Sequence, residues 1–348
     1  MAIPSILLNF LFPPPPSLFV TTMSVIGISS LTNAGFMELK GKHMQYSKFL
    51  NVGAAKKENE MKLSSRNGML WFYTPAFLVG LASLLVFHDQ DQRFVLLASA
   101  LTIHFLKRVL EVLFLHKYSG STGLETTITV TLSYTLSTAT MIYAQYLSRD
   151  LPDPSIDLKY FGIGLFMIGI IGNFYHHYIL ANLRKEGEKE YKIPQGGLFD
   201  LVICPHYLFE ILGYVGMACI SQTLYAFAFT TGTIFYLTGR SCATREWYIR
   251  KFGDKFPKEV TLGRPYCGQW VEGRKKLNSV AGSTESCFHF IHLFDPTVWL
   301  LNVSSHLELS RITTTKNENQ RLDQGTPQPR LLVFNKRCNV LIFLFYLN

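Results

Sequence analysis

Residues 201–239, LVICPHYLFEILGYVGMACISQTLYAFAFTTGTIFYLTG, contain a single side chain that is expected to be ionised, that of Glu210. A helix that crosses a membrane needs about 20 mostly apolar residues, so this stretch is too long for one crossing. We therefore predict two short helices that turn near Ser221 and Gln222.

Uncharged intervals of similar length recur earlier in the chain. A first helix is predicted at about residues 17–36, after the prolines of residues 13–16. A third, at about 94–115, is interrupted by three charged residues, Lys107, Arg108 and Glu111. The other intervals lie between Arg66 and Asp89, between Glu125 and Arg149, and between Lys159 and Arg184. The sequence thus predicts an all-α polytopic membrane protein with about seven transmembrane helices.

The composition supports this fold class. Of 348 residues, 48% are hydrophobic and only 16% are charged, against about 25% charged in an ordinary soluble domain. The net charge of +9 is typical of basic cytoplasmic loops in a membrane protein. No Lys/Arg run is interleaved with aromatic residues, so no nucleic-acid partner is predicted. No two of the six cysteines have C-x-x-C spacing, which argues against a zinc or redox motif.

The loop charges alternate along the chain. Residues 38–66 carry seven Lys or Arg, whereas residues 149–159 carry three Asp. Lys/Arg-rich loops remain in the cytosol. This pattern predicts a lumenal N-terminus, with residues 184–200 and 240–276 in the cytosol, and it favours the endoplasmic reticulum.

Polar residues gather at the cytosolic end of the fifth helix. Asn173, His177 and Arg184 fall within about 40° of one helical face. Four residues apart, His206 and Glu210 share a face of the next helix, whose N-terminus could favour a phosphate. We predict a ligand site here. The alternatives are a buried polar seam and a loop that only connects two helices.

Two other patterns are interpreted as structural. Four glycines resemble a nucleotide-binding loop but lie within a predicted helix, so we expect them to serve helix packing: Gly162, Gly164, Gly169 and Gly172. His176, His177 and the His206/Glu210 pair could suggest two metal ions, but the other histidines are scattered. No metal is predicted.

Three motifs, together with Asn173, resemble the steroid 5-alpha-reductase family, to which plant proteins described as 3-oxo-5-alpha-steroid 4-dehydrogenases belong. They are LRKEGEKEYKIPQGGLF (183–199), CPHYLFE (204–210) and GRSCATREWYIRKF (239–252). A further segment, HFLKRVLEVLFLHKYSG (104–120), is similar to trans-2-enoyl-CoA reductases of very-long-chain fatty acid elongation.

The resemblance implies seven helices that hold NADPH among the later helices and the cytosolic loops. Three basic residues, Arg184, Lys192 and Arg240, are then candidate phosphate partners. By the family's motifs, the cofactor-contact positions are Asn173, His177, Arg184, Tyr191, Lys192, His206, Glu210, Arg240 and Tyr248. His177 replaces an Asp of the steroid reductases, and His206 replaces an Asn.

The substrate end departs from the family. Steroid reductases use a Glu in the second helix and a Tyr in the third to bind the substrate ketone, and Tyr73 and Phe105 stand at these positions. A phenylalanine cannot donate a hydrogen bond. We therefore predict Tyr73 as the catalytic hydrogen-bond donor, with His104 as a weaker candidate.

The predicted function is NADPH-dependent reduction of a carbon–carbon double bond conjugated to a carbonyl, in a steroid-like or related lipid. The alternatives are a trans-2-enoyl-CoA reductase and a membrane methyltransferase that uses S-adenosylmethionine. Expected partners are the bilayer, the lipid substrate and other membrane enzymes of lipid synthesis.

Three regions are expected. Residues 1–60 form a helix and a basic loop, and residues 61–260 form the membrane domain, whose steroid-reductase-like part begins at about 125. Residues 261–348 form a disordered tail without family resemblance.

Overall fold

The computed structural model describes residues 9–50, 61–87, 90–118, 120–183 and 190–256. All of them lie in one of the chain's two compact units, Met1–Pro296. The predicted tail, residues 261–348, and Arg184 lie outside the described residues.

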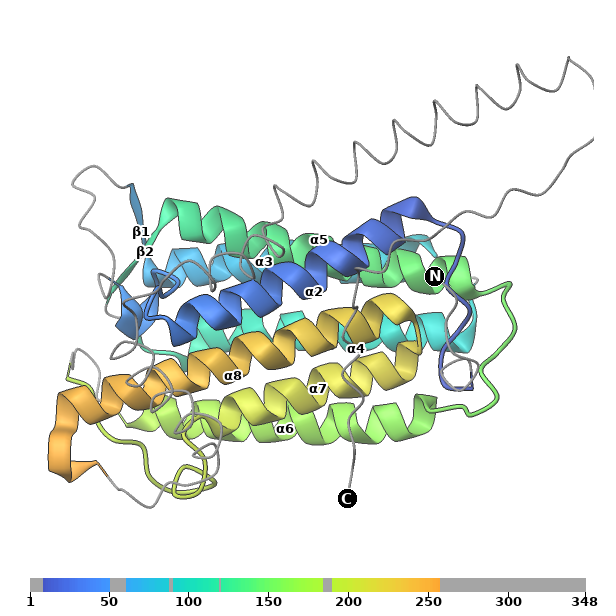
Figure 1. Cartoon of the computed structure of the whole chain (residues 1–348). Helices are drawn as coiled ribbons and strands as arrows, with labels where there is room; N and C mark the ends of the chain where they lie inside the picture. Colours follow the sequence, from blue (N-terminus) through green and yellow to red (C-terminus); the bar gives the residue numbers. More distant parts are fainter. Residues whose placement is uncertain (1–8, 51–60, 88–89, 119, 184–189, 257–348) are drawn as a thin grey trace, which may run out of the picture. The chain divides into compact units, whose positions relative to one another are not determined.

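Most of the described chain is helical. Figure 1 shows long helices packed side by side. Their bounds are α2 (Leu18–Leu39), α3 (Ser65–Val86), α4 (Gln92–Leu110), α5 (Leu124–Ser148), α6 (Lys159–Asn182), α7 (Pro205–Ser221) and α8 (Leu224–Phe252).

The turn predicted within residues 201–239 is confirmed. Helix α7 ends at Ser221, and Gln222 adopts the left-handed conformation with φ of 50°. Thr223 then caps α8, because its hydroxyl accepts a hydrogen bond from the backbone N–H of Ala226. The described chain therefore contains both helices of the pair.

Two features differ from the prediction. Helix α8 does not end at Gly239 but continues to Phe252, because Arg240 is neutralised by Glu38 inside the fold rather than solvated in a loop. Two three-residue strands, β1 (Lys62–Ser64) and β2 (Ser121–Gly123), pair antiparallel, so the fold is not purely α-helical. Such short strands leave no usable periodicity in the sequence.

Gly162, Gly169 and Gly172 bring α6 into close contact with α7, which confirms the packing role predicted for these three. A Cβ atom on Gly162 would lie 2.6 Å from the backbone oxygen of Gly216. One on Gly169 would lie 2.4 Å from the backbone nitrogen of Gly213. Small residues allow helix backbones to approach this closely. Gly164 faces open space instead.

Adding a methyl group at Gly169 should therefore destabilise the fold. We expect Gly169→Ala to lower the free energy of unfolding by about 1–3 kcal/mol, as overpacking does elsewhere. Gly164→Ala, in the same helix, is the matched control, because no atom lies within 4 Å of its new Cβ. Thermal unfolding in detergent should separate the two variants, and equal melting temperatures would contradict the packing role.

The outer surfaces of the helices are apolar. Among the described residues, α2, α3 and α6 are long and apolar enough to cross a membrane. Large apolar side chains such as Leu85, Phe114 and Phe161 are exposed. An extended apolar surface of this kind fits lipid rather than water.

The helices alternate in direction, so their ends fall into two groups. Figure 1 shows β1, β2 and the last turns of α8 at one end of the bundle. The C-terminal ends of α4 and α6 and the N-terminal ends of α3, α5 and α7 lie at this end too. The described parts of the loops predicted to be cytosolic thus lie at one end.

Candidate functional site

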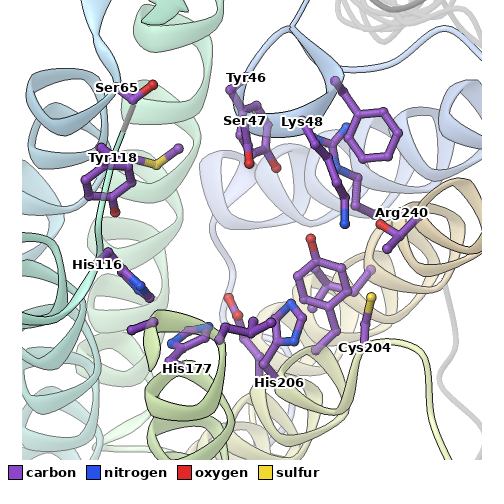
Figure 2. Close-up of a pocket in the computed structure, with 18 of the residues that line it drawn as sticks. Tyr46, Ser47, Lys48, Ser65, His116, Tyr118, His177, Cys204, His206 and Arg240 are labelled. Carbon is purple, nitrogen blue, oxygen red and sulfur yellow. The ribbon is translucent and has the colours of Figure 1, made fainter. Parts of the chain in front are cut away.

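A cavity of about 340 Å³ opens at this end of the bundle. Its wall combines the loop after α2, the start of α3 and the ends of α4, α6 and α8. In Figure 2, Lys48 and Arg240 lie on one side of the cavity, His116 and Tyr118 on the other, and His177 and His206 between them. Segments far apart in the sequence therefore build one site.

The cavity wall is cationic and rich in tyrosine. Five basic residues line it, against one acid, Glu210; they are Lys48, Arg108, Lys117, Lys192 and Arg240. Eight tyrosines line it, which are Tyr46, Tyr73, Tyr118, Tyr134, Tyr191, Tyr207, Tyr236 and Tyr248. Such a wall suits an anionic ligand that also contains aromatic rings, which can pack against the tyrosines.

Most of the predicted site residues meet at this cavity. The residues that line it are Tyr73, His177, Tyr191, Lys192, His206, Glu210, Arg240 and Tyr248. Arg184 lies outside the described residues. The remaining two, Asn173 and His104, are buried beside the cavity and do not line it.

Asn173 connects helices instead of facing the cavity. Its Nδ2 donates to the backbone oxygen of His206 at 2.7 Å, and its Oδ1 accepts a hydrogen bond from Lys107. This geometry holds the first turn of α7, where His206 lines the cavity. Asn173 can thus position a cavity residue but does not itself reach into the cavity.

His104 and Phe105 belong to the core. The His104 ring packs against Phe105 and Tyr214, with ring centroids 5.0 and 5.2 Å apart. Phe105 is 1% exposed and also packs against Tyr134. The residue at the family's tyrosine position therefore does not reach the cavity.

Arg240 is committed to an internal ion pair. Its Nη1 lies 2.5 Å from Oε1 of Glu38, and both side chains are almost completely buried. The guanidinium lies over the rings of Tyr46 and Phe49, at 4.4 and 4.1 Å. Its Nε has no partner among the described residues. A phosphate contact by Arg240 would thus have to use its remaining N–H groups.

A second charged cluster beside the cavity was not predicted as functional. Arg108 donates to the Tyr73 hydroxyl at 2.6 Å and lies 3.3 Å from a carboxylate oxygen of Glu111. Lys107 lies 2.8 Å from the other Glu111 oxygen, and His177 contacts both Arg108 and Glu111. The signal was present in the sequence, since ionisable residues inside a predicted span are functional candidates.

Three members of this region have the spacing of metal ligands. The ligand atoms of Glu111, His116 and His177 lie within 4.8 Å of one another. However, Lys107 and Arg108 already neutralise Glu111, and an Arg108 Nη lies 3.2 Å from His177. A divalent cation would add charge to a site that already has two cations.

His116 lies just after the π-helical turn Glu111–Leu115 that follows α4. Burial, followed by the nearby Arg108, lowers the pKa of His116 from 6.5 to about 4. The side chain is therefore neutral at pH 7.

Because the fold disfavours protonated His116, acid should weaken the fold through this residue. Between about pH 6.5 and pH 4 the unfolded chain binds a proton that the folded chain does not, so the free energy of unfolding falls as pH falls. We expect His116→Gln to lose less stability than wild type between pH 7 and pH 4.5. Unfolding midpoints at the two pH values measure this, and identical losses would contradict the pKa shift.

Comparison with known proteins confirms the resemblance found in the sequence. Residues 124–266 match the family model described as 3-oxo-5-alpha-steroid 4-dehydrogenase. All nine predicted cofactor residues fall in this range, whereas Tyr73 and His104 precede it.

Individual relatives are of two kinds. The chain is 34% identical over 175 residues to the very-long-chain enoyl-CoA reductase of Dictyostelium discoideum, covering 47% of the chain and 55% of that protein. It is 39% identical over 105 residues to the steroid 5-alpha-reductase DET2 of Gossypium hirsutum, covering 30% and 41%. Over 97 residues it is 42% identical to 3-oxo-5-alpha-steroid 4-dehydrogenase 1 of Homo sapiens, covering 28% and 37%. The alignments thus span about half of these relatives or less.

Proposed function

We propose that this chain is a membrane oxidoreductase that uses NADPH to reduce a carbon–carbon double bond conjugated to a carbonyl in a lipid. One observation carries the proposal. A single cavity joins cationic and aromatic residues of the family-matched region to the hydroxyl of Tyr73, which lies outside that region.

The cavity wall fits the chemistry of NADPH. Its phosphates need cations, and five basic residues line the wall, although two of them, Arg108 and Arg240, also pair with Glu111 and Glu38 behind it. Cys204, His206 and Tyr207 line the cavity at the N-terminus of α7, where backbone N–H groups favour an anion. Nδ1 of His206 is buried without a partner among the described residues, so it is available to a ligand. The residues proposed to hold the cofactor are Tyr191, Lys192, His206, Arg240 and Tyr248.

The reaction follows from the position of Tyr73. When bound, NADPH supplies a hydride for the β carbon of the substrate. Negative charge then develops on the carbonyl oxygen, and a hydrogen bond from the Tyr73 hydroxyl stabilises that charge. The apolar core behind it, which includes Phe105, keeps water from that side. The α carbon finally takes up a proton.

The membrane setting is part of the proposal. We infer that all seven helices cross the bilayer and that the cavity opens toward the cytosol, where the basic loops lie. An apolar substrate would reach the site from the lipid. The endoplasmic reticulum is the proposed location.

An enoyl-CoA reductase remains a second candidate. The alignment with the Dictyostelium discoideum enoyl-CoA reductase covers more of the chain than those with the two steroid reductases. In addition, Phe105 is buried and cannot supply the second hydrogen bond that steroid reductases give the ketone. Lys117 on the cavity wall could instead contact an anionic carrier.

Purified protein in lipid nanodiscs tests both candidates. It is incubated with NADPH deuterated on the transferred hydrogen and with 3-oxo-4-ene steroids or trans-2-enoyl-CoAs, and the products are analysed by mass spectrometry. Incorporation of one deuterium into one class of product identifies the substrate. If neither class is reduced by a protein that binds NADPH, the proposed function is wrong.

A further inference from the structure

We infer that Arg108 is the positioning residue for the Tyr73 hydroxyl and that the buried charged cluster around it holds Arg108 in place. This inference rests on the proposed function, since it concerns how Tyr73 acts. It goes beyond the family resemblance, because Tyr73 itself replaces the family's glutamate.

The contact between Arg108 and Tyr73 has a defined direction. A guanidinium can only donate, so in the 2.6 Å contact the Tyr73 oxygen must be the acceptor. The hydroxyl proton is thereby left to donate elsewhere, and Tyr73 lines the cavity. Donation into the oxygen also polarises the O–H bond, because linked hydrogen bonds strengthen one another.

Arg108 is itself held by buried partners. Its Nη1 lies 3.3 Å from Oε2 of Glu111 and 3.2 Å from Nδ1 of His177, while Nη2 bonds Tyr73. Glu111 is 2% exposed. Glu111, one turn further along the chain, and His177, on the facing helix α6, therefore fix the guanidinium before any substrate binds.

Two cations and two acids meet around the Tyr73 hydroxyl. Lys107 and Arg108 both contact Glu111, and Glu210 on the cavity wall interacts electrostatically with Arg108 and Tyr73. Of these four groups, Arg108 is the one that donates to the Tyr73 oxygen. In a site that excludes water, a donor that is already fixed keeps the hydroxyl oriented toward a developing oxyanion without reorganisation.

The test is a double-mutant cycle between Arg108 and Tyr73, measured with the substrate found in the nanodisc assay. Arg108→Lys keeps the charge but loses the planar fork that holds several partners at once. We expect it to lower kcat by about 10- to 100-fold, as a small misplacement of a catalytic group does. KM and NADPH affinity, measured by fluorescence titration, should stay within about twofold, because the contact acts after binding.

The decisive result is non-additivity. In a Tyr73→Phe background, Arg108→Lys should lower kcat only slightly further, because the hydroxyl that it positions is gone. Independent losses that multiply would overturn the inference, as would a normal kcat in Arg108→Lys. Arg93→Lys is the matched control: Arg93 is a buried arginine of the same helix that pairs with Asp157 outside the cavity, and its kcat should be unchanged.

A second variant covers a failure of Arg108→Lys to fold. Arg108→Gln retains an N–H donor for Tyr73 but removes the charge, so its kcat should fall further, by about 100-fold or more. Wild type without NADPH-dependent turnover would contradict the proposed function. Active wild type with normal turnover in either Arg108 variant would overturn this inference alone.

Discussion

Tyr73→Phe should lower kcat by about 100- to 1,000-fold, the usual loss when one donor to a developing oxyanion is removed. The substitution removes only the hydroxyl, whose single hydrogen-bond partner among the described residues is Arg108. The ring keeps its contacts with Phe72 and Tyr134. Stopped-time assays of product formation at saturating NADPH measure the effect.

NADPH affinity separates catalysis from binding in this variant. The proposed partner of Tyr73 is the substrate oxygen, so the dissociation constant for NADPH should change by less than about twofold. Tyr225→Phe is the control for loss of a buried tyrosine hydroxyl outside the cavity. If Tyr73→Phe turns over as wild type does, another group must stabilise the oxyanion.

The helices could be predicted because a bilayer sets the length of a helix that crosses it and requires mostly apolar residues along that length. Both properties can be read directly from the sequence. The turn at Gln222 was placed correctly, since residues 201–239 are too long for one span. The end of α8 was placed too early, because the sequence does not show that Glu38 neutralises Arg240. Charge on a single residue predicts a helix end only where that charge is solvated.

The residues that line the cavity could likewise be predicted only in part from the sequence. Motif resemblance predicts cofactor contacts for Lys192, His206 and Tyr248, each of which lies in a specific motif, and the structure places all three on the cavity wall. It did not identify Lys48 or Arg108, which reach the cavity from segments that precede the family-matched residues. Their role depends on how α2 and α4 pack against α6 and α8, which no local pattern encodes.

The loop after α2 depends on one buried carboxylate. Glu38 pairs with Arg240, lies 2.7 Å from Nδ1 of His43 and accepts from the backbone N–H of Met44 at 3.1 Å. The loop continues into Tyr46 and Lys48, which line the cavity. A single side chain thus links the stability of the α2–α8 contact to the shape of the cavity wall.

Glu38→Gln should therefore destabilise the protein by about 3–5 kcal/mol, because it leaves the buried guanidinium of Arg240 without a counter-charge. Unfolding in detergent measures the loss. Glu246→Gln is the control for removing the acid of an arginine ion pair, since its partner Arg250 is 72% exposed and such surface pairs contribute about 0–1 kcal/mol.

A double variant separates charge from loop anchoring. Replacing a whole buried pair by apolar residues is often neutral for stability, so Glu38→Met/Arg240→Met should recover most of the loss. Its NADPH affinity should fall below that of Arg240→Met alone, which removes a proposed cofactor residue but keeps Glu38. In the double variant His43 and Met44 also lose their carboxylate, so the wall at Tyr46 and Lys48 is no longer held. Fluorescence titration of NADPH measures that affinity. A double variant that is stable and binds NADPH as Arg240→Met does would show that Glu38 serves only the pairing of α2 with α8.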